Sequence, residues 1–168
     1  MIVTHIETVR VDELPQIIWV NIHTDNGIIG LGETWYAPTV VEAAIHDHFG
    51  PLIIGRDPRN VELHWESMFR LSDHAGYGGA EMRAISAIDM ALWDIKGQEV
   101  EMPIYELLGG AVRKKIRVYA TGMPYTGVVD HVRKLLDRGI TAMKGGPTIP
   151  LAIPSDGQYL SPKDLDRA

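Results

Sequence analysis

A regular apolar pattern between Ala80 and Lys96 predicts one long helix with a buried face. Apolar residues recur there at spacings of three and four, which places them on one side of a helix. Lys96 would lie in the last turn, and Gly97 would end the helix in the left-handed conformation. The stripe consists of Ala84, Ile85, Ile88, Ala91, Leu92 and Ile95. Because several nearby residues are small, we expect another element to approach this helix closely.

Two aspartates, Asp89 and Asp94, lie on the same predicted helix. Asp89 borders the apolar stripe beside Ile85 and Leu92, and a carboxylate buried there needs polar partners. We interpret it as part of a structural hydrogen bond or ion pair that holds the helix to its neighbour. A catalytic role is the alternative.

The N-terminal segment predicts an antiparallel three-stranded meander. Residues 2–10 alternate and are rich in β-branched side chains, and residues 16–24 place Ile18, Val20 and Ile22 on one face. Asp25, Asn26 and Gly27 form a strong hairpin signal before a third strand over 28–33, because Asn and Gly accept positive φ.

Helices and loops follow the meander, which predicts a mixed α+β domain. The expected elements are a helix over 38–49 ended by Gly50 and Pro51, a helix over 60–71 with Asn60 as N-cap, a glycine-rich loop over 72–79, and a short helix over 103–108 closed by Gly109 and Gly110.

The pattern changes after residue 114. A strand over 115–120, an amphipathic helix over 127–138 and a strand over 140–144 predict a βαβ unit with two parallel strands. A proline-rich loop over 147–157 and a helix start at Ser161 follow. Because an isolated βαβ unit leaves two sheet edges open, we expect this part to be incomplete.

Composition excludes some classes of function. The chain has 168 residues and no cysteine, which rules out disulfides and cysteine-based metal sites. Its net charge of -6 argues against a nucleic-acid partner. We recognise no leader peptide and no membrane span, so a cytoplasmic location is the default expectation. The seven histidines are scattered and form no recognisable metal motif.

Five residues are candidates for a functional site. Trp35 and Tyr36 follow the third predicted strand, and exposed aromatic residues on a loop can form a pocket wall or pack on a helix. His74 and Tyr77 share the glycine-rich loop and have the same two interpretations. Lys144 ends a predicted parallel strand, where barrel enzymes place catalytic groups. A structural lysine is the alternative there.

Several segments together resemble the mandelate racemase/muconate lactonizing group of the enolase superfamily, with the acid-sugar dehydratase branch as the closest likeness. They are residues 79–97 (its long capping-domain helix), 24–33 (its first hairpin), 103–110 with 118–120 (its passage into the barrel) and 139–144 (its second barrel strand). The resemblance implies an α+β capping domain over 1–114, followed over 115–168 by the incomplete start of a (β/α)8 barrel.

The resemblance also implies a chemistry. Members abstract the proton α to a carboxylate and stabilise the resulting enediolate on Mg2+. The metal ligands would come from later barrel strands beyond Ala168, so none is expected within this chain. From residue 116 onward there are roughly 50 residues, against about 250 in a complete barrel. The expected activity is that of a lyase (dehydratase) or an isomerase (racemase) acting on a sugar acid or another carboxylate.

The resemblance also implies roles for individual residues. Many members carry Lys-x-Lys on the second barrel strand, whereas this chain has Lys144, Gly145 and Gly146. Lys144 is therefore the candidate catalytic residue, and neutralising the substrate carboxylate suits it better than acting as the base. Trp35 and Tyr36 match one substrate-covering loop, and residues 11–15 match a short version of the other. The resemblance further implies a homo-oligomer.

Two alternatives remain open at this point. The chain can be a stand-alone, non-catalytic capping-type domain that binds a partner or self-associates. It can also be a small-ligand binding module that uses Trp35, Tyr36 and Tyr77.

Overall fold

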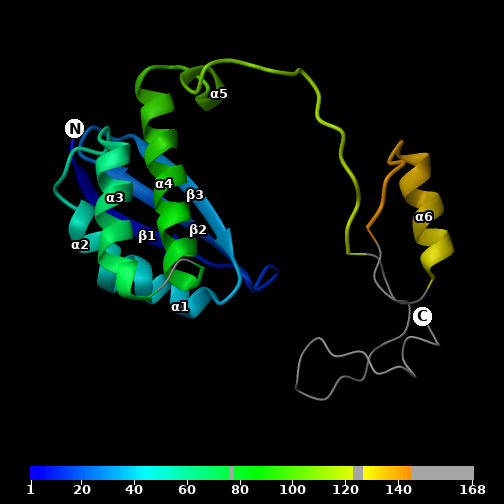
Figure 1. Cartoon of the computed structure of the whole chain (residues 1–168), viewed down its shortest axis with the longest axis horizontal. Coiled ribbons are helices and arrows are strands. Elements are labelled where there is room, and N and C mark those ends of the chain that lie inside the picture. The colour runs from blue at the N-terminus through cyan, green and yellow to red at the C-terminus, as the bar shows by residue number, and fades with distance from the viewer. Residues whose placement is uncertain (76–77, 123–126, 145–168) are drawn as a thin grey trace. The chain divides into compact units, whose positions relative to one another are not determined.

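The computed structural model describes residues 1–75, 78–122 and 127–144. The chain divides into two compact units, Met1–Ala111 and Val112–Ala168 (Figure 1). The predicted loop over 147–157 and the helix start at Ser161 lie outside the described residues.

The first unit opens with the predicted meander. Strands β1 (Val3–Val9), β2 (Ile17–Thr24) and β3 (Ile29–Trp35) form an antiparallel sheet in the order β1-β2-β3. Ile6 pairs with Ile22, and Val20 pairs with Gly32. Gly27 adopts a φ of 87° in the hairpin turn, as the sequence predicts.

The helical run after the sheet is longer than predicted. It comprises α1 (Pro38–Ala43), a π-helix η1 (Ala44–Phe49) and α2 (Gly50–Ile53). The prediction that Gly50 and Pro51 end the helix is therefore wrong. The wide π turns of η1 precede Pro51, which then occupies the first turn of α2, where a missing amide donor is tolerated.

Helix α3 (Val61–Ser72) and the single 3-10 turn η2 (Asp73–Ala75) follow. Asn60 occupies the predicted N-cap position, but within the described part its side chain makes no capping hydrogen bond. The buried His64 ring instead lies 2.8 Å from the carbonyl oxygen of Asp57, which ties the first turn of α3 to the segment before it.

Helix α4 (Ala80–Glu99) is the predicted long helix, and it continues past Gly97. The expectation that Gly97 forms a left-handed C-cap is wrong, because Gly97 is buried inside the helix. A Cβ atom there would lie 3.0 Å from the carbonyl oxygen of Met102. The positive φ near this end, 52°, belongs to Glu101. The short helix α5 (Ile104–Leu107) then ends at Gly109 and Gly110, both with positive φ, as predicted.

Helix α4 packs on one face of the sheet beside α3 (Figure 1). The two glycines of β3 make this approach close. A Cβ atom at Gly32 would lie 1.9 Å from the carbonyl oxygen of Ala87, and one at Gly30 would lie 2.1 Å from that of Ala91. The predicted close approach is therefore a backbone contact between β3 and α4. The largest fully buried side chains of this core include Phe49, Ile18, Ile22, Ile45, Ile53, Met68, Ile85, Ile88, Leu92 and Ile95.

Polar side chains of α4 bond to the backbone of β3, which is an edge strand. The Leu31 amide donates to Asp94 Oδ2 at 2.8 Å, and Gln98 Nε2 donates to the carbonyl oxygen of Ile29 at 2.7 Å. Arg83 donates to the carbonyl oxygen of Trp35 at 2.9 Å. These bonds occupy backbone groups that an edge strand otherwise offers to a passing chain.

The second unit contains α6 (Val128–Asp137), which begins after Gly127 and ends before Gly139, both with positive φ. Among the described residues, the predicted strands over 115–120 and 140–144 form only a parallel bridge between Ala120 and Met143. Ile116 and Val118 are 74% and 64% exposed. Parallel strands are stable when both sheet faces are covered, and this pair of segments has no such cover in the described part.

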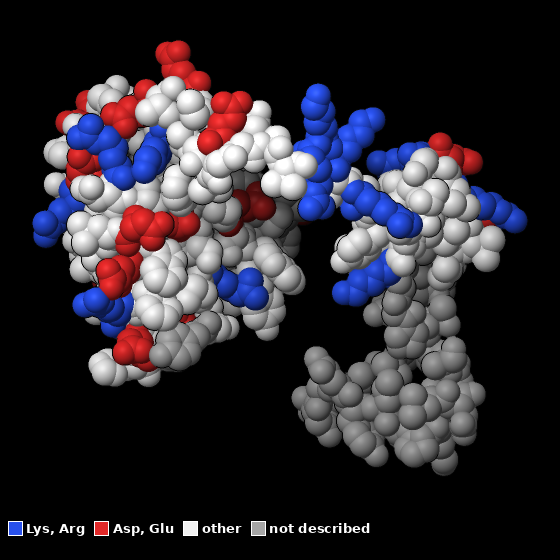
Figure 2. Space-filling view, turned by 45° about the horizontal axis from the view of Figure 1, so that its top comes forward, with Lys and Arg blue, Asp and Glu red and all other residues white. Residues whose placement is uncertain are grey.

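Within the described residues, no helix is both long enough and apolar enough to span a membrane. Figure 2 shows Asp and Glu interspersed with Lys and Arg over the visible face of the first unit. The described part of the second unit is mainly basic: its acidic residues are Asp130 and Asp137, and its basic residues are Arg113, Lys114, Lys115, Arg117, Arg133, Lys134, Arg138 and Lys144.

Candidate functional site

Two exposed aromatic residues form a projecting group at the end of β3. Trp35 is 61% exposed and Tyr36 is 58% exposed, and their rings meet edge to face with centroids 5.9 Å apart. We call these two residues the aromatic lip. Trp35 is the last residue of β3. The prediction that Trp35 follows the strand is therefore wrong, and the strand ends one residue before Tyr36.

The backbone of the lip is held in an uncommon conformation. Tyr36 has a φ of 76° and Ala37 a φ of 50°, although neither is glycine. Each such residue costs about 1–3 kcal/mol and persists only where its surroundings determine it. The Tyr36 amide donates to the carbonyl oxygen of Gln16 at 2.8 Å, which fixes one side of the turn.

Arg83, in the first turn of α4, fixes the other side. Besides its bond to the Trp35 carbonyl oxygen, its guanidinium carbon lies 5.6 Å from the Trp35 ring centroid and 5.3 Å from that of Tyr36. Both distances are in the cation–π range. Arg83 was not among the residues predicted from the sequence. The sequence did contain one sign of its role. Arg83 is spaced three or four residues apart along the helix from the residues that face β3, which are Ala87, Ala91, Asp94 and Gln98.

The lip shares one end of the sheet with other connections. Figure 1 shows the β1–β2 connection, the end of β3, α1 and the start of α4 gathered there. Val11 and Leu14 in the β1–β2 connection are exposed. Arg10 pairs with Glu42 of α1 at 3.1 Å, which joins the end of β1 to that helix. The two segments that the resemblance assigned to substrate-covering loops therefore lie at the same end.

The remaining candidates are His74, Tyr77 and Lys144. His74 is exposed in η2, and Tyr77 lies outside the described residues. Lys144 belongs to the second unit and has an exposed side chain. Its amide donates to the carbonyl oxygen of Ala120 at 2.8 Å, so its backbone is at the parallel bridge as the βαβ prediction requires.

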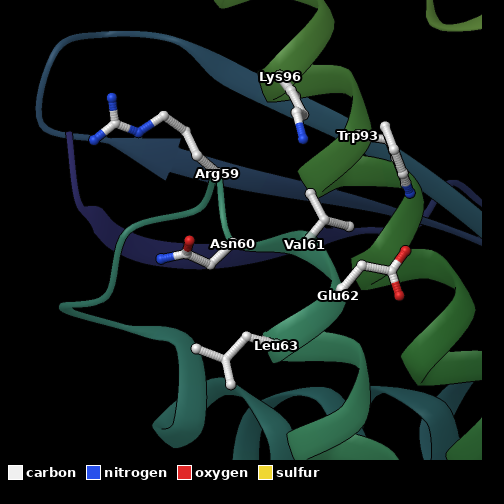
Figure 3. Close-up of a pocket in the computed structure, with 7 residues that line it drawn as sticks. All are labelled: Arg59, Asn60, Val61, Glu62, Leu63, Trp93 and Lys96. Atoms are coloured by element: carbon white, nitrogen blue, oxygen red, sulfur yellow. The ribbon is translucent and has the colours of Figure 1, made fainter. Parts of the chain in front are cut away.

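A hollow of about 280 Å³ lies between the start of α3 and α4 (Figure 3). Its lining residues are Arg59, Asn60, Val61, Glu62, Leu63, Trp93 and Lys96. The two cations there already have partners: Arg59 bonds to Asp57 at 2.6 Å and lies 3.6 Å from Glu99, and Lys96 lies over the Trp93 ring at 5.1 Å. With its cations engaged and Glu62 on its wall, the hollow does not form an anion site.

Electrostatic surroundings shift two aspartates of this unit in opposite directions. Hydrogen bonds from Arg59 lower the pKa of Asp57 to about 2. Burial, with the nearby negative charge of Glu62, raises the pKa of Asp89. Asp94, by contrast, accepts the Leu31 amide and so holds α4 to β3. Among the described residues no hydrogen bond or ion pair joins Asp89 to a neighbour, although such a bond was predicted for Asp89.

Among residues 1–75, 78–122 and 127–144, no group of three acidic or histidine residues could hold a metal ion. The described residues therefore do not fit a magnesium site.

Comparison with known families identifies the chain. Residues 3–109 match the family described as "Mandelate racemase / muconate lactonizing enzyme, N-terminal domain". The match spans the meander, α1 to α5 and the aromatic lip. The chain therefore belongs to this family of the enolase superfamily, and its first unit is the family's capping domain.

The relatives that match this chain indicate which enzymes of the superfamily it is related to. A D-galactonate dehydratase of Variovorax paradoxus is 40% identical over 148 residues, which are 86% of this chain and 38% of the relative. An enolase of the mandelate racemase subgroup from Agrobacterium tumefaciens is 43% identical, with a TM-score of 0.80 over 99% of this chain and 44% of its own. An enolase from Pantoea ananatis with bound D-gluconate and Mg is 32% identical, with a TM-score of 0.72 over 84% of this chain and 35% of its own. The chain thus spans less than half the length of these proteins and is related to acid-sugar dehydratases.

Proposed function

We propose that this chain is the N-terminal part of a cytoplasmic, homo-oligomeric, Mg2+-dependent enzyme that abstracts the proton α to the carboxylate of a sugar acid. Dehydration is the favoured reaction and racemisation the second. The observation that carries the proposal is the 40% identity to a D-galactonate dehydratase over 86% of the chain. In this proposal, residues 1–114 are the capping domain and residues 115–168 begin the barrel. The division of the chain after Ala111 supports that boundary.

The chain's own contribution would be to bind and cover the substrate. Trp35 and Tyr36, with His74 and Tyr77, would cover the sugar acid, since exposed aromatic rings suit the apolar faces of a sugar. The exposure of the lip at the end of β3 supports this role. Lys144 would neutralise the substrate carboxylate, and the basic composition of residues 113–144 would attract an anionic substrate.

The metal would be held outside the described residues. Mg2+ would offset the negative charge that develops on the carboxylate oxygens when the α proton leaves. The Pantoea relative with bound D-gluconate and Mg supports both the ion and the substrate class. In a dehydration the proton leaves C2, the hydroxyl leaves C3 as water, and the enol becomes a 2-keto-3-deoxy acid.

The test is an assay of the full-length gene product. It should be incubated with D-galactonate, D-gluconate and galactarate, each with Mg2+ or with EDTA, and both the 2-keto acid and the acid inverted at C2 should be measured. We expect Mg2+-dependent keto acid from at least one of them. If the Mg2+-loaded protein neither dehydrates nor racemises any acid in the panel, the proposal fails.

A second candidate is a non-catalytic capping-type domain that binds a partner or self-associates. The observation in its favour is that Met1–Ala111 forms a compact unit with its own hydrophobic core. It requires the 168-residue chain to unfold cooperatively as a whole. Limited proteolysis that removes the segment after Ala111 under native conditions, while the first unit stays intact, would count against it.

A further inference from the structure

Three contacts of Arg83 meet at the point where β3 turns into the lip. One is a hydrogen bond, in which the guanidinium donates to the Trp35 carbonyl oxygen at 2.9 Å. The other two are cation–π contacts, at 5.6 Å to the Trp35 ring and 5.3 Å to the Tyr36 ring. The same side chain therefore contacts the backbone and both rings of the lip.

The lip needs such a support for a physical reason. Tyr36 and Ala37 are both left-handed, and the rings of Trp35 and Tyr36 are mostly exposed, so little burial holds them in place. A planar guanidinium can stack on a ring while it donates a hydrogen bond in its own plane. A lysine ammonium is a point charge without a planar face, so it cannot stack on the rings while it donates a hydrogen bond to the Trp35 carbonyl oxygen.

The position of Arg83 separates it from the general packing of α4. Leu31 and Ile29 are held to the same helix by Asp94 and Gln98, at the other end of β3. Those two bonds secure the strand to the helix without touching the lip. Arg83 bonds to the last residue of β3 and contacts both rings of the lip, so among these three residues it is the one placed to order the lip.

We propose that Arg83 is a positioning residue that holds Trp35 and Tyr36 in one conformation, ready to cover a bound substrate. The catalytic consequence of this inference rests on the proposed function; the ordering of the lip does not. A lip that is ordered before binding loses less conformational entropy when the substrate arrives. Loss of Arg83 should therefore weaken substrate binding, raising KM more than it lowers kcat.

The test compares backbone order in variants of the 168-residue chain by 15N NMR relaxation. Arg83→Gln removes the charge and the stacking, and Arg83→Lys keeps the charge but loses the planar fork. The matched control is Gln98→Ala, which removes a side-chain hydrogen bond from α4 to a carbonyl oxygen of the same strand, away from the lip.

We expect the order parameters of the Tyr36 and Ala37 amides to fall from about 0.85 to below about 0.6 in Arg83→Gln. Arg83→Lys should show a smaller fall at the same two amides, and Gln98→Ala should show none. If Arg83→Gln fails to fold, Arg83→Lys decides the question by the same readout. Unchanged order in the arginine variants, or an equal fall in Gln98→Ala, overturns the inference.

Kinetics of the full-length enzyme separate this inference from the proposed function. If the arginine variants have disordered Tyr36 and Ala37 amides and a raised KM for D-galactonate, the positioning role and the proposed function are both supported. Disordered amides with unchanged KM leave the positioning role standing and refute the proposed role of the lip in covering substrate. Ordered amides in the arginine variants refute the positioning role, whatever the enzyme's kinetics.

Discussion

Asp94 and Asp89 lie on the same helix and have different surroundings. Asp94 Oδ2 accepts hydrogen bonds from the Leu31 amide at 2.8 Å and from Gln98 at 2.9 Å. Asp89 is half-buried, and the charge that raises its pKa is the like charge of Glu62. Replacing the first should therefore destabilise the fold, and neutralising the second should not.

Asp94→Ala should lower the free energy of unfolding by about 1–3 kcal/mol, because the Leu31 amide loses a charged acceptor. Urea unfolding followed by circular dichroism measures this change. Glu66→Ala is the matched control, since Glu66 pairs with Arg70 on the exposed surface of α3, and such exposed helix pairs contribute about 0.3–0.5 kcal/mol. Equal effects of the two substitutions would contradict the assigned role of Asp94.

The raised pKa of Asp89 predicts a pH dependence of stability. An acid whose pKa is raised on folding stabilises the folded state below its unfolded pKa, and that contribution is lost as pH rises through the folded value. Asp89→Asn cannot titrate, so its stability relative to the parent chain should improve as pH rises from about 3.8. Unfolding measured across pH 3.5 to 7 checks this.

Asp57→Asn is the control, because the pKa of Asp57 is shifted in the opposite direction from that of Asp89. The pKa of Asp57 is lowered to about 2, so the stability it contributes is present above 3.8 and is lost as pH falls toward about 2. The stability difference between Asp57→Asn and the parent should therefore shrink on acidification. Unfolding of this variant is measured down to about pH 2. A difference that stays constant from pH 7 to about pH 2 for Asp57→Asn, and from pH 3.5 to 7 for Asp89→Asn, would contradict the two assigned surroundings.

At the scale of elements, the contact between β3 and α4 depends on two glycines. Gly32→Ala should destabilise the chain by about 3 kcal/mol, the upper end of the range for overpacking, because the new methyl group meets a backbone oxygen that cannot turn away. Thermal or urea unfolding gives the value. The control is Gly78→Ala, where a Cβ atom would meet no atom of the described residues within 4 Å. Similar stability of the two variants would contradict the close backbone approach.

The sequence predicts these elements well where local pattern and tertiary packing agree. The three strands alternate, and the stripe on α4 has a helical period, so both elements follow from spacing alone. Gly97 misled the prediction because a glycine can also serve close packing inside a helix, and only the position of Met102 shows which applies. The run through Gly50 and Pro51 was missed because a π-helix has no simple sequence signal.

The candidate site was predictable only in part. Trp35 and Tyr36 were identified from their place after a strand, and their exposure agrees with a role at the surface. Arg83 was missed because its partners are distant in sequence and one of them is a backbone carbonyl oxygen, which any residue at that position provides. The strands over 115–120 and 140–144 were predicted from their β-branched residues, but parallel pairing needs neighbouring strands and covering helices.

At the scale of the whole molecule, Lys144 is the residue through which the second unit would act. In the full-length enzyme, Lys144→Ala should raise KM for D-galactonate roughly 10- to 150-fold, since a charged hydrogen bond contributes about 1.5–3 kcal/mol. Lys134→Ala, which removes an exposed lysine from α6, is the control and should change KM little. A loss confined to kcat, with a changed pH profile, would make Lys144 a base and contradict the neutralising role.

The central claim is that this chain is one part of a barrel enzyme, and the intact mass of the native gene product tests it most directly. The chain itself has a mass of 18.7 kDa. We expect a product heavier by about 20 kDa or more, because roughly 200 further residues are needed to close a (β/α)8 barrel. A product near 18.7 kDa would contradict the account, unless a second polypeptide supplies the remaining strands.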